Sequence, residues 1–128
     1  TRPMAPAFER APPAAGPVVR GYGDGGFLVE GEAYPALLLT PEAARRWDPP
    51  PLAGLTLNDL QPLLDLEPAP EFLILGTGAA MAFAPRALAA ALEARGIGLE
   101  AMDSRAAART WTVLRAEERW IVAALMSL

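Results

Sequence analysis

The 128-residue chain contains no cysteine, no histidine and no lysine. Disulfides, thiol nucleophiles, Ser–His or Cys–His catalytic pairs and zinc sites built on cysteine or histidine are therefore excluded. The absence of lysine also excludes Schiff-base chemistry and a phosphate-binding P-loop lysine. What remains is a set of carboxylates, arginines and hydroxyls, without any side chain whose ordinary pKa lies near neutrality. This inventory favours a non-enzymatic protein without a cofactor or a metal, although an enzyme with a strongly shifted Asp or Glu, or with a bound cofactor, stays open.

Long hydrophobic runs and an excess of positive charge are also missing. No apolar run approaches the roughly 18 residues that cross a bilayer, so we expect a protein that does not span the membrane. No secretory signal is readable at the start, which favours a cytoplasmic location, with peripheral attachment to the inner membrane as the alternative. The formal net charge of −4 gives no global attraction for nucleic acid. All eleven basic residues are arginine, a usage typical of GC-rich bacterial genomes.

The pattern of proline and apolar residues divides the chain into two parts. Residues 1–17 are rich in proline and alanine and poor in large side chains, which predicts a disordered or extended tail. Residues 18–128 form the expected single domain. Apolar runs between turn residues predict strands at 18–22, 27–30, 36–39, 72–75, 97–102 and 120–126. Helical spacing and capping residues predict helices at 41–47, 57–64, 85–95 and 104–115.

The second half of the domain fixes the expected fold class. Residues 72–75 are continuously apolar, as in a strand buried on both faces. The strand–helix–strand order across 72–102 makes its two strands parallel, whereas the hairpin at 18–30 is antiparallel. We therefore expect an α/β protein with a mixed central sheet and helices on both of its faces.

Two loops that follow parallel strands are candidate binding elements. Gly76, Thr77 and Gly78 come directly after the strand at 72–75, and Asp103 and Ser104 follow the strand at 97–102. Because parallel strands end at the same edge of a sheet, we expect these loops to lie together, where open α/β sheets often bind ligands. The alternatives are structural: the glycines let the chain leave a buried strand steeply, and Asp103 caps the next helix. The glycine spacing does not match a dinucleotide-binding fingerprint, since Met81 and Pro85 break the pattern.

Arg105 and Arg109 are four residues apart and share one face of the predicted helix 104–115. Such a pair can hold a carboxylate or phosphate on a ligand or on a partner protein. The alternative is a solvated stripe that pairs with acids such as Glu100 or Glu117. The candidate ligand-binding residues are Gly76, Thr77, Gly78, Asp103, Ser104 and Arg109, and none is assigned a catalytic role.

Several segments of the domain, in the order in which they occur, resemble those of one known family. The segments are 19–23, Phe27, Gly31, Trp47, 73–78, 95–100, 102–107, 109–114, 117–119 and 122–125. Taken together, they are similar to a small domain-of-unknown-function family that includes a mitochondrial respiratory complex I assembly factor. The resemblance covers roughly residues 18–128. It departs from the family pattern at Ala108, where many relatives have cysteine, at Trp111-Thr112 in place of Tyr-Asn, and at Glu118 in place of glycine.

The resemblance implies a three-layer α/β/α fold, with a pocket around the 76–78 loop and the 103–110 segment. It favours a non-enzymatic interaction or assembly module, with a protein partner, that acts in the biogenesis of a membrane or respiratory complex. Homo-oligomers are compatible with this expectation. The alternative is a binding protein or enzyme for a small anionic ligand, built on the same loop and segment.

Overall fold

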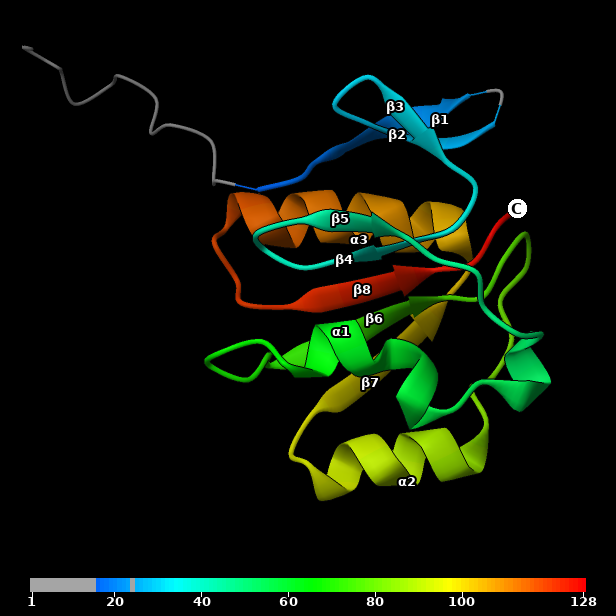
Figure 1. The fold of residues 1–128 in the computed structure, drawn as a ribbon, viewed down its shortest axis with the longest axis vertical. Helices are drawn as coiled ribbons and strands as arrows, with labels where there is room; N and C mark the ends of the chain where they lie inside the picture. The colour runs from blue at the N-terminus through cyan, green and yellow to red at the C-terminus, as the bar shows by residue number, and fades with distance from the viewer. Residues whose placement is uncertain (1–15, 24) are drawn as a thin grey trace, which may run out of the picture.

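The computed structural model describes residues 16–23 and 25–128, so the predicted tail lies outside the described residues except for Gly16 and Pro17. Five strands form the main sheet, in the order β5-β4-β8-β6-β7 (Figure 1). They are β4 (Leu37–Leu39), β5 (Ala44–Arg46), β6 (Phe72–Gly76), β7 (Gly98–Met102) and β8 (Val122–Leu125). Strand β6 is parallel to both β7 and β8, whereas β4 is antiparallel to β8 and to β5. The predicted mixed sheet and its parallel pair are confirmed.

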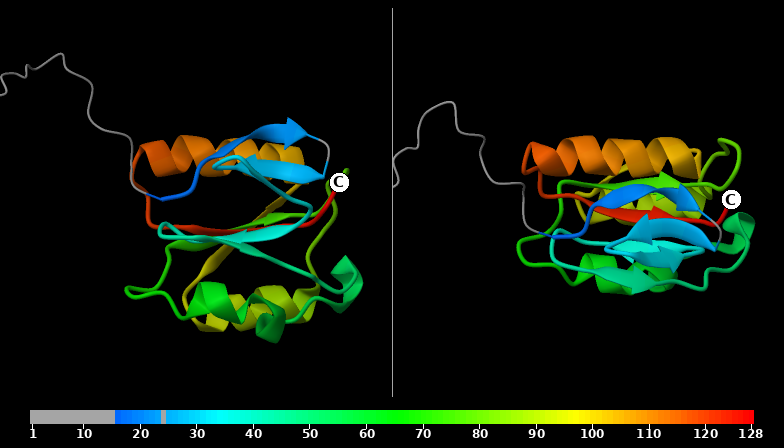
Figure 2. Two further views of the ribbon diagram at one scale, coloured as in Figure 1. Left: turned by 45° about the horizontal axis from the view of Figure 1, so that its top comes forward. Right: turned by 90° about the horizontal axis from the view of Figure 1, so that it is seen from above.

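Helices pack against apolar side chains on the main sheet, and each face of the sheet has its own buried cluster. Leu73 and Leu75 belong to one cluster with Leu88 and Leu92 of helix α2 (Arg86–Ala94). The same cluster includes side chains from helix α1 (Gln61–Leu64). Ile74 points into the other cluster, together with Trp111 of helix α3 (Ser104–Ala116). Figure 2 (left) shows α3 on one side of the sheet and α1 and α2 on the other. Because side chains alternate along β6, one buried strand supplies both clusters.

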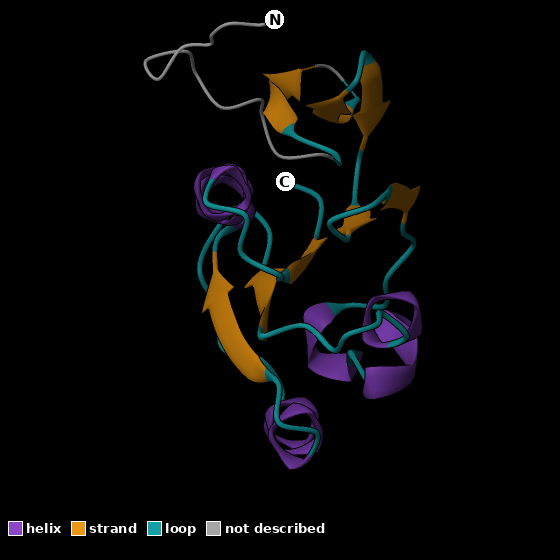
Figure 3. Cartoon of the chain, turned by 90° about the vertical axis from the view of Figure 1, so that its left-hand side faces the viewer, coloured by secondary structure: helices purple, strands orange, loops and turns teal. Residues whose placement is uncertain are grey.

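A second sheet of three antiparallel strands lies beside α3 and apart from the main sheet (Figure 3). It consists of β1 (Val19–Gly23), β2 (Gly26–Val29) and β3 (Glu32–Tyr34). The predicted hairpin is confirmed, but β3 was not predicted. Phe27 and Val29 of β2 join the buried cluster under α3. The buried Trp111 indole Nε1 donates a hydrogen bond to the Pro17 carbonyl at 3.1 Å. Helix α3 therefore packs between the two sheets and fixes where the small sheet lies.

The prediction of a helix at 41–47 is wrong, because residues 44–46 form strand β5. Thr40 does act as a capping residue, since its Oγ1 accepts hydrogen bonds from the backbone N–H groups of Glu42 (3.1 Å) and Ala43 (3.0 Å). These bonds close a tight turn, after which the chain runs back beside β4 as strand β5. A hydroxyl that caps a turn uses the same bonds as one that caps a helix, so the local signal is ambiguous.

The remaining predicted helices form close to their expected positions. Residues 57–64 contain a 3-10 turn, η2 (Leu57–Leu60), followed by α1, with Pro62 in the first turn of α1. A further 3-10 turn, η1, covers Leu52–Gly54. Within the described ranges, no helix is both long and apolar enough to cross a membrane. The chain is a mixed α/β protein with a five-stranded mixed sheet.

Candidate functional site

The two candidate loops meet at the carboxyl edge of the parallel strands, as predicted. The backbone N–H of Thr77 donates to the Met102 carbonyl at 2.8 Å, and the N–H of Ser104 donates to the Gly78 carbonyl at 2.8 Å. Asp103 caps α3, because its Oδ1 accepts a hydrogen bond from the N–H of Ala106 at 2.9 Å. The polar groups of this edge are consequently turned toward each other.

Ser104 ties this edge together and is fully buried. Its Oγ accepts a hydrogen bond from the N–H of Gly78 at 2.8 Å and donates one to the carbonyl of Met126 at 2.7 Å. A Cβ on Gly76 would lie only 2.7 Å from the Ser104 Oγ and 2.9 Å from its Cα. Glycine is therefore required at position 76 because the start of α3 passes directly over it. The Ser104 hydroxyl, Gly76 and Gly78 therefore serve the packing of the loop after β6, the start of α3 and the chain that follows β8.

Thr77 holds the loop that follows β6. Its Oγ1 lies 2.7 Å from the Ala80 carbonyl and 3.2 Å from the Met102 carbonyl, and it accepts a hydrogen bond from the N–H of Ala82 at 3.1 Å. The loop presents Phe83 (85% exposed) and Met81 (51% exposed) to solvent. Five of the six candidate residues therefore lie together at this edge and make contacts within the chain; they are Gly76, Thr77, Gly78, Asp103 and Ser104. The sixth, Arg109, lies further along α3.

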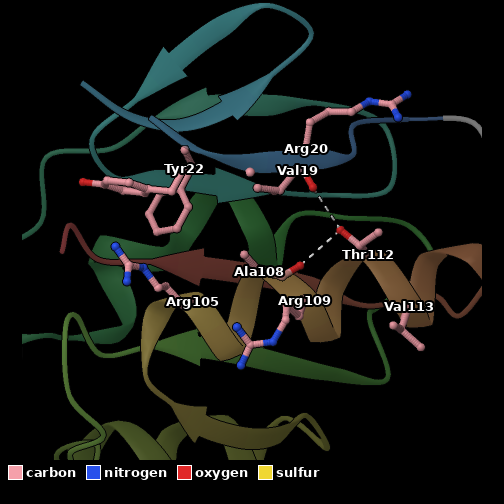
Figure 4. A pocket seen from close by; sticks show the side chains of 10 residues that line it. Val19, Arg20, Tyr22, Arg105, Ala108, Arg109, Thr112 and Val113 are labelled. Carbon is pink, nitrogen blue, oxygen red and sulfur yellow. Dashed lines mark hydrogen bonds between the residues drawn. The ribbon is translucent and has the colours of Figure 1, made fainter. Parts of the chain in front are cut away.

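Arg109 lines a cleft between helix α3 and the small sheet, which we call the α3–β1 cleft (Figure 4). The cleft has a volume of about 580 Å³. Its lining residues come from two elements that are distant in the sequence: Val19, Arg20, Gly21, Tyr22 and Phe27 from the small sheet, and Arg105, Ala108, Arg109, Thr112 and Val113 from α3. At one end the Thr112 hydroxyl lies 3.4 Å from the Val19 carbonyl, which joins the helix to strand β1.

The walls of the α3–β1 cleft are apolar and partly aromatic. Phe27 and Ala108 are buried, whereas Tyr22 and Val113 are exposed by 40% and 57%. The Tyr22 and Phe27 rings meet edge to face, with their centroids 4.9 Å apart. The Arg105 guanidinium lies over the Tyr22 ring, 5.5 Å from its centroid. An aromatic wall of this kind offers contact area at a low cost in side-chain entropy.

Positive charge surrounds this apolar surface. The side chains of Arg20, Arg105 and Arg109 are exposed, and the described lining residues include no carboxylate. Among the described residues, ion pairs form between Arg46 and Glu32 and between Arg119 and Glu71, away from the cleft. The predicted alternative, in which Arg105 or Arg109 pairs with Glu100 or Glu117, is not seen in this part of the chain. The cleft therefore presents, beside an apolar wall, guanidinium groups that have no carboxylate partner within residues 16–23 and 25–128.

Sequence reasoning found the helical half of this site but not the other half. The spacing of Arg105 and Arg109 marked one exposed face of α3, and that face does line the cleft. No signal in the sequence indicated that Tyr22 and Phe27 would face it, because the small sheet reaches α3 only through tertiary packing. The described residues include no cluster of three or more acidic side chains that could hold a metal ion.

The comparisons with known proteins agree with this fold. The chain belongs to the family described as "protein of unknown function (DUF498/DUF598)", whose model matches residues 19–126. An uncharacterized protein of Rhodobacter capsulatus is 35% identical over 127 residues, which cover 98% of this chain and 93% of that protein. The family resemblance found in the sequence is thereby confirmed.

Two further relatives extend the comparison to a named protein and to a solved structure. NADH dehydrogenase [ubiquinone] 1 alpha subcomplex assembly factor 3 of Danio rerio is 31% identical over 114 residues, which cover 88% of this chain and 66% of that protein. The crystal structure of a Bordetella parapertussis protein superposes with a TM-score of 0.78 at 36% identity. That match covers 91% of this chain and 100% of the other.

Proposed function

We propose that this protein is a non-enzymatic interaction module that binds a partner protein through the α3–β1 cleft. The observation that carries the proposal is the combination, in one cleft, of an aromatic wall with three arginines that have no carboxylate partner among the described residues. Tyrosine and arginine are enriched where protein interfaces derive most of their binding energy. The lack of His, Cys and Lys further favours binding over catalysis.

The biological context of the proposal comes from the relatives. Because one relative is named as an assembly factor, we propose that the partner takes part in the assembly of a membrane or respiratory complex. We further propose a three-layer α/β/α architecture, with residues 18–128 as a single domain. A cytoplasmic location with peripheral access to the inner membrane, and homo-oligomers as one mode of association, belong to the same proposal.

A second candidate function is the binding or conversion of a small anionic ligand. The cleft volume of about 580 Å³ favours it, since ligand pockets commonly measure about 300–1,000 Å³. Arg109 and the rest of the 103–110 segment would contribute to such a site. The 76–78 loop supports it less, because the N–H of Thr77 and the N–H of Gly78 are already bonded within the chain.

Affinity capture of the tagged protein from its native cells, in mild detergent, tests the proposed function. Arg109→Ala is the test variant, and Arg86→Ala, an exposed arginine at the start of α2, is the matched control. We expect a recurring assembly-factor or membrane-complex partner that is lost with Arg109→Ala and kept with Arg86→Ala. Capture of no specific partner, or equal capture by both variants, would contradict the proposal.

A further inference from the structure

We propose that the occupant of the α3–β1 cleft is a short, extended segment of the partner that carries acidic side chains beside a large apolar one. This inference rests on the proposed function and adds the chemistry of the recognised segment. It follows from three features of the cleft, which are its charge, its apolar wall and the edge of strand β1, whose described residues pair with no strand other than β2.

The charge of the cleft selects an anionic segment. Arg20 belongs to the small sheet, and Arg105 and Arg109 belong to α3, so arginines border the cleft on both sides, with the guanidiniums of Arg20 and Arg109 at its outer rim (Figure 4). Each guanidinium offers five N–H donors and no acceptor, in a planar arrangement that suits a carboxylate. The described lining contains no acidic side chain that would compete for these donors. A basic or neutral segment would leave the arginines without partners as it removed water from them.

The apolar wall of the cleft favours a bound segment that carries an apolar side chain in addition to its acidic ones. Tyr22 and Val113 are partly exposed, and Figure 4 shows them on either side of the buried Ala108. Covering them with an apolar side chain removes hydrocarbon surface from water, which a purely acidic segment does not do. The Arg105 guanidinium already stacks over the Tyr22 ring, so its N–H groups are held in place for a carboxylate close to that apolar contact.

The backbone beside the cleft suits an extended chain. In the order β1-β2-β3, strand β1 lies at the edge of the small sheet, and its described residues pair only with β2. Its register shifts between Val19 and Gly21, and a Cβ placed on Gly21 would meet no atom within 4 Å. A bare backbone at an edge strand permits close approach of a second chain.

The protein's own N-terminal segment matches the cleft only in part, because Glu9 follows Phe8 but is itself followed by Arg10. Residues 1–15 contain two arginines, Arg2 and Arg10, and one acidic residue, Glu9, so their side chains carry a net charge of 2 − 1 = +1. That charge has the same sign as the cleft. The occupant should therefore come from a partner protein.

Selection of a random displayed peptide library on the immobilised 128-residue chain tests the inference before the partner is known. We expect enriched peptides to share Asp or Glu next to a large apolar residue. A fluorescent copy of the enriched peptide then measures affinity for the variants. Arg109→Ala should weaken binding about tenfold or more, and Arg109→Lys should weaken it less, because lysine keeps the charge but loses the planar fork. Arg86→Ala should leave the affinity unchanged.

Three outcomes would overturn the inference. Enrichment of basic or uncharged peptides, or of none, removes the acidic segment as the occupant. Equal binding by Arg109→Ala and Arg86→Ala removes the cleft as its location. Calorimetric binding of free succinate as tight as that of the enriched peptide makes the cleft a small-molecule site. The failure of this inference can be told apart from the failure of the proposed function. If acidic peptides are not enriched but affinity capture still recovers a partner that depends on Arg109, the inference fails and the proposed function stands.

Discussion

The buried hydroxyl of Ser104 gives the most quantitative test of how the edge of the sheet is used. Ser104→Ala keeps the backbone that passes over Gly76 but deletes the oxygen that bonds to Gly78 and Met126. The Gly78 N–H and the Met126 carbonyl then lose their hydrogen-bond partner in a site where the serine itself is fully buried. Each unsatisfied buried group costs about 1–3 kcal/mol, so for the two groups we expect a loss of roughly 2–6 kcal/mol in the free energy of unfolding.

Urea unfolding followed by circular dichroism measures this loss directly. With a slope of about 2 kcal/mol per M for a chain of this size, the midpoint should fall by roughly 1–3 M. Ser127→Ala makes the same change at an exposed position and should alter stability by less than about 0.5 kcal/mol. If Ser104→Ala is as mild as Ser127→Ala, the edge is not held together as described, and an open ligand site there regains support.

Three further predictions concern other parts of the fold. Trp111→Phe removes the indole donor from the buried Pro17 carbonyl, which should cost about 1–2 kcal/mol in urea unfolding and speed proteolysis near residue 17; unchanged cleavage would refute this. Glu118 adopts a φ of +62°, so Glu118→Gly should increase the free energy of unfolding by roughly 1 kcal/mol and thereby raise the urea midpoint. A lower midpoint would count against backbone strain at this position. The hydrogen bond from Arg119 lowers the pKa of Glu71, and in an NMR titration Arg119→Gln should raise that pKa toward its usual value. Because the folded pKa is the lower one, this pair stabilises the fold above the unfolded pKa and loses its effect as the pH falls through the folded pKa.

The second half of the fold could be predicted because its signals are local. The continuous apolar run at 72–75, Pro85 before α2 and Gly96 after it mark each boundary within about one residue. Gly96 has a φ of +77°, as expected of a glycine that ends a helix. Asp103 caps α3 as its side-chain chemistry predicts. The meeting of the two loops then follows from the parallel order of the strands.

The first half could be predicted less well because its structure depends on tertiary contacts. Residues 44–46 contain two arginines, yet they form an edge strand because β4 offers a partner. The three residues of β3 form a strand only beside β2. The α3–β1 cleft has the same origin, since Tyr22 meets Arg105 only after the small sheet has packed on the helix. Charge spacing along α3 could mark one wall of the cleft but not the cleft itself.

Site-specific photo-crosslinking in native cells tests most directly whether the α3–β1 cleft is the binding surface. A photoreactive amino acid replaces Val113, which is exposed in the cleft, and in separate samples it replaces Phe83 on the loop after β6 or Ala90 on the outside of α2. We predict a discrete crosslinked partner from position 113 and none from position 90. Crosslinks from position 83 alone, or the same products from all three positions, would contradict the role of the cleft and assign the interaction to another surface.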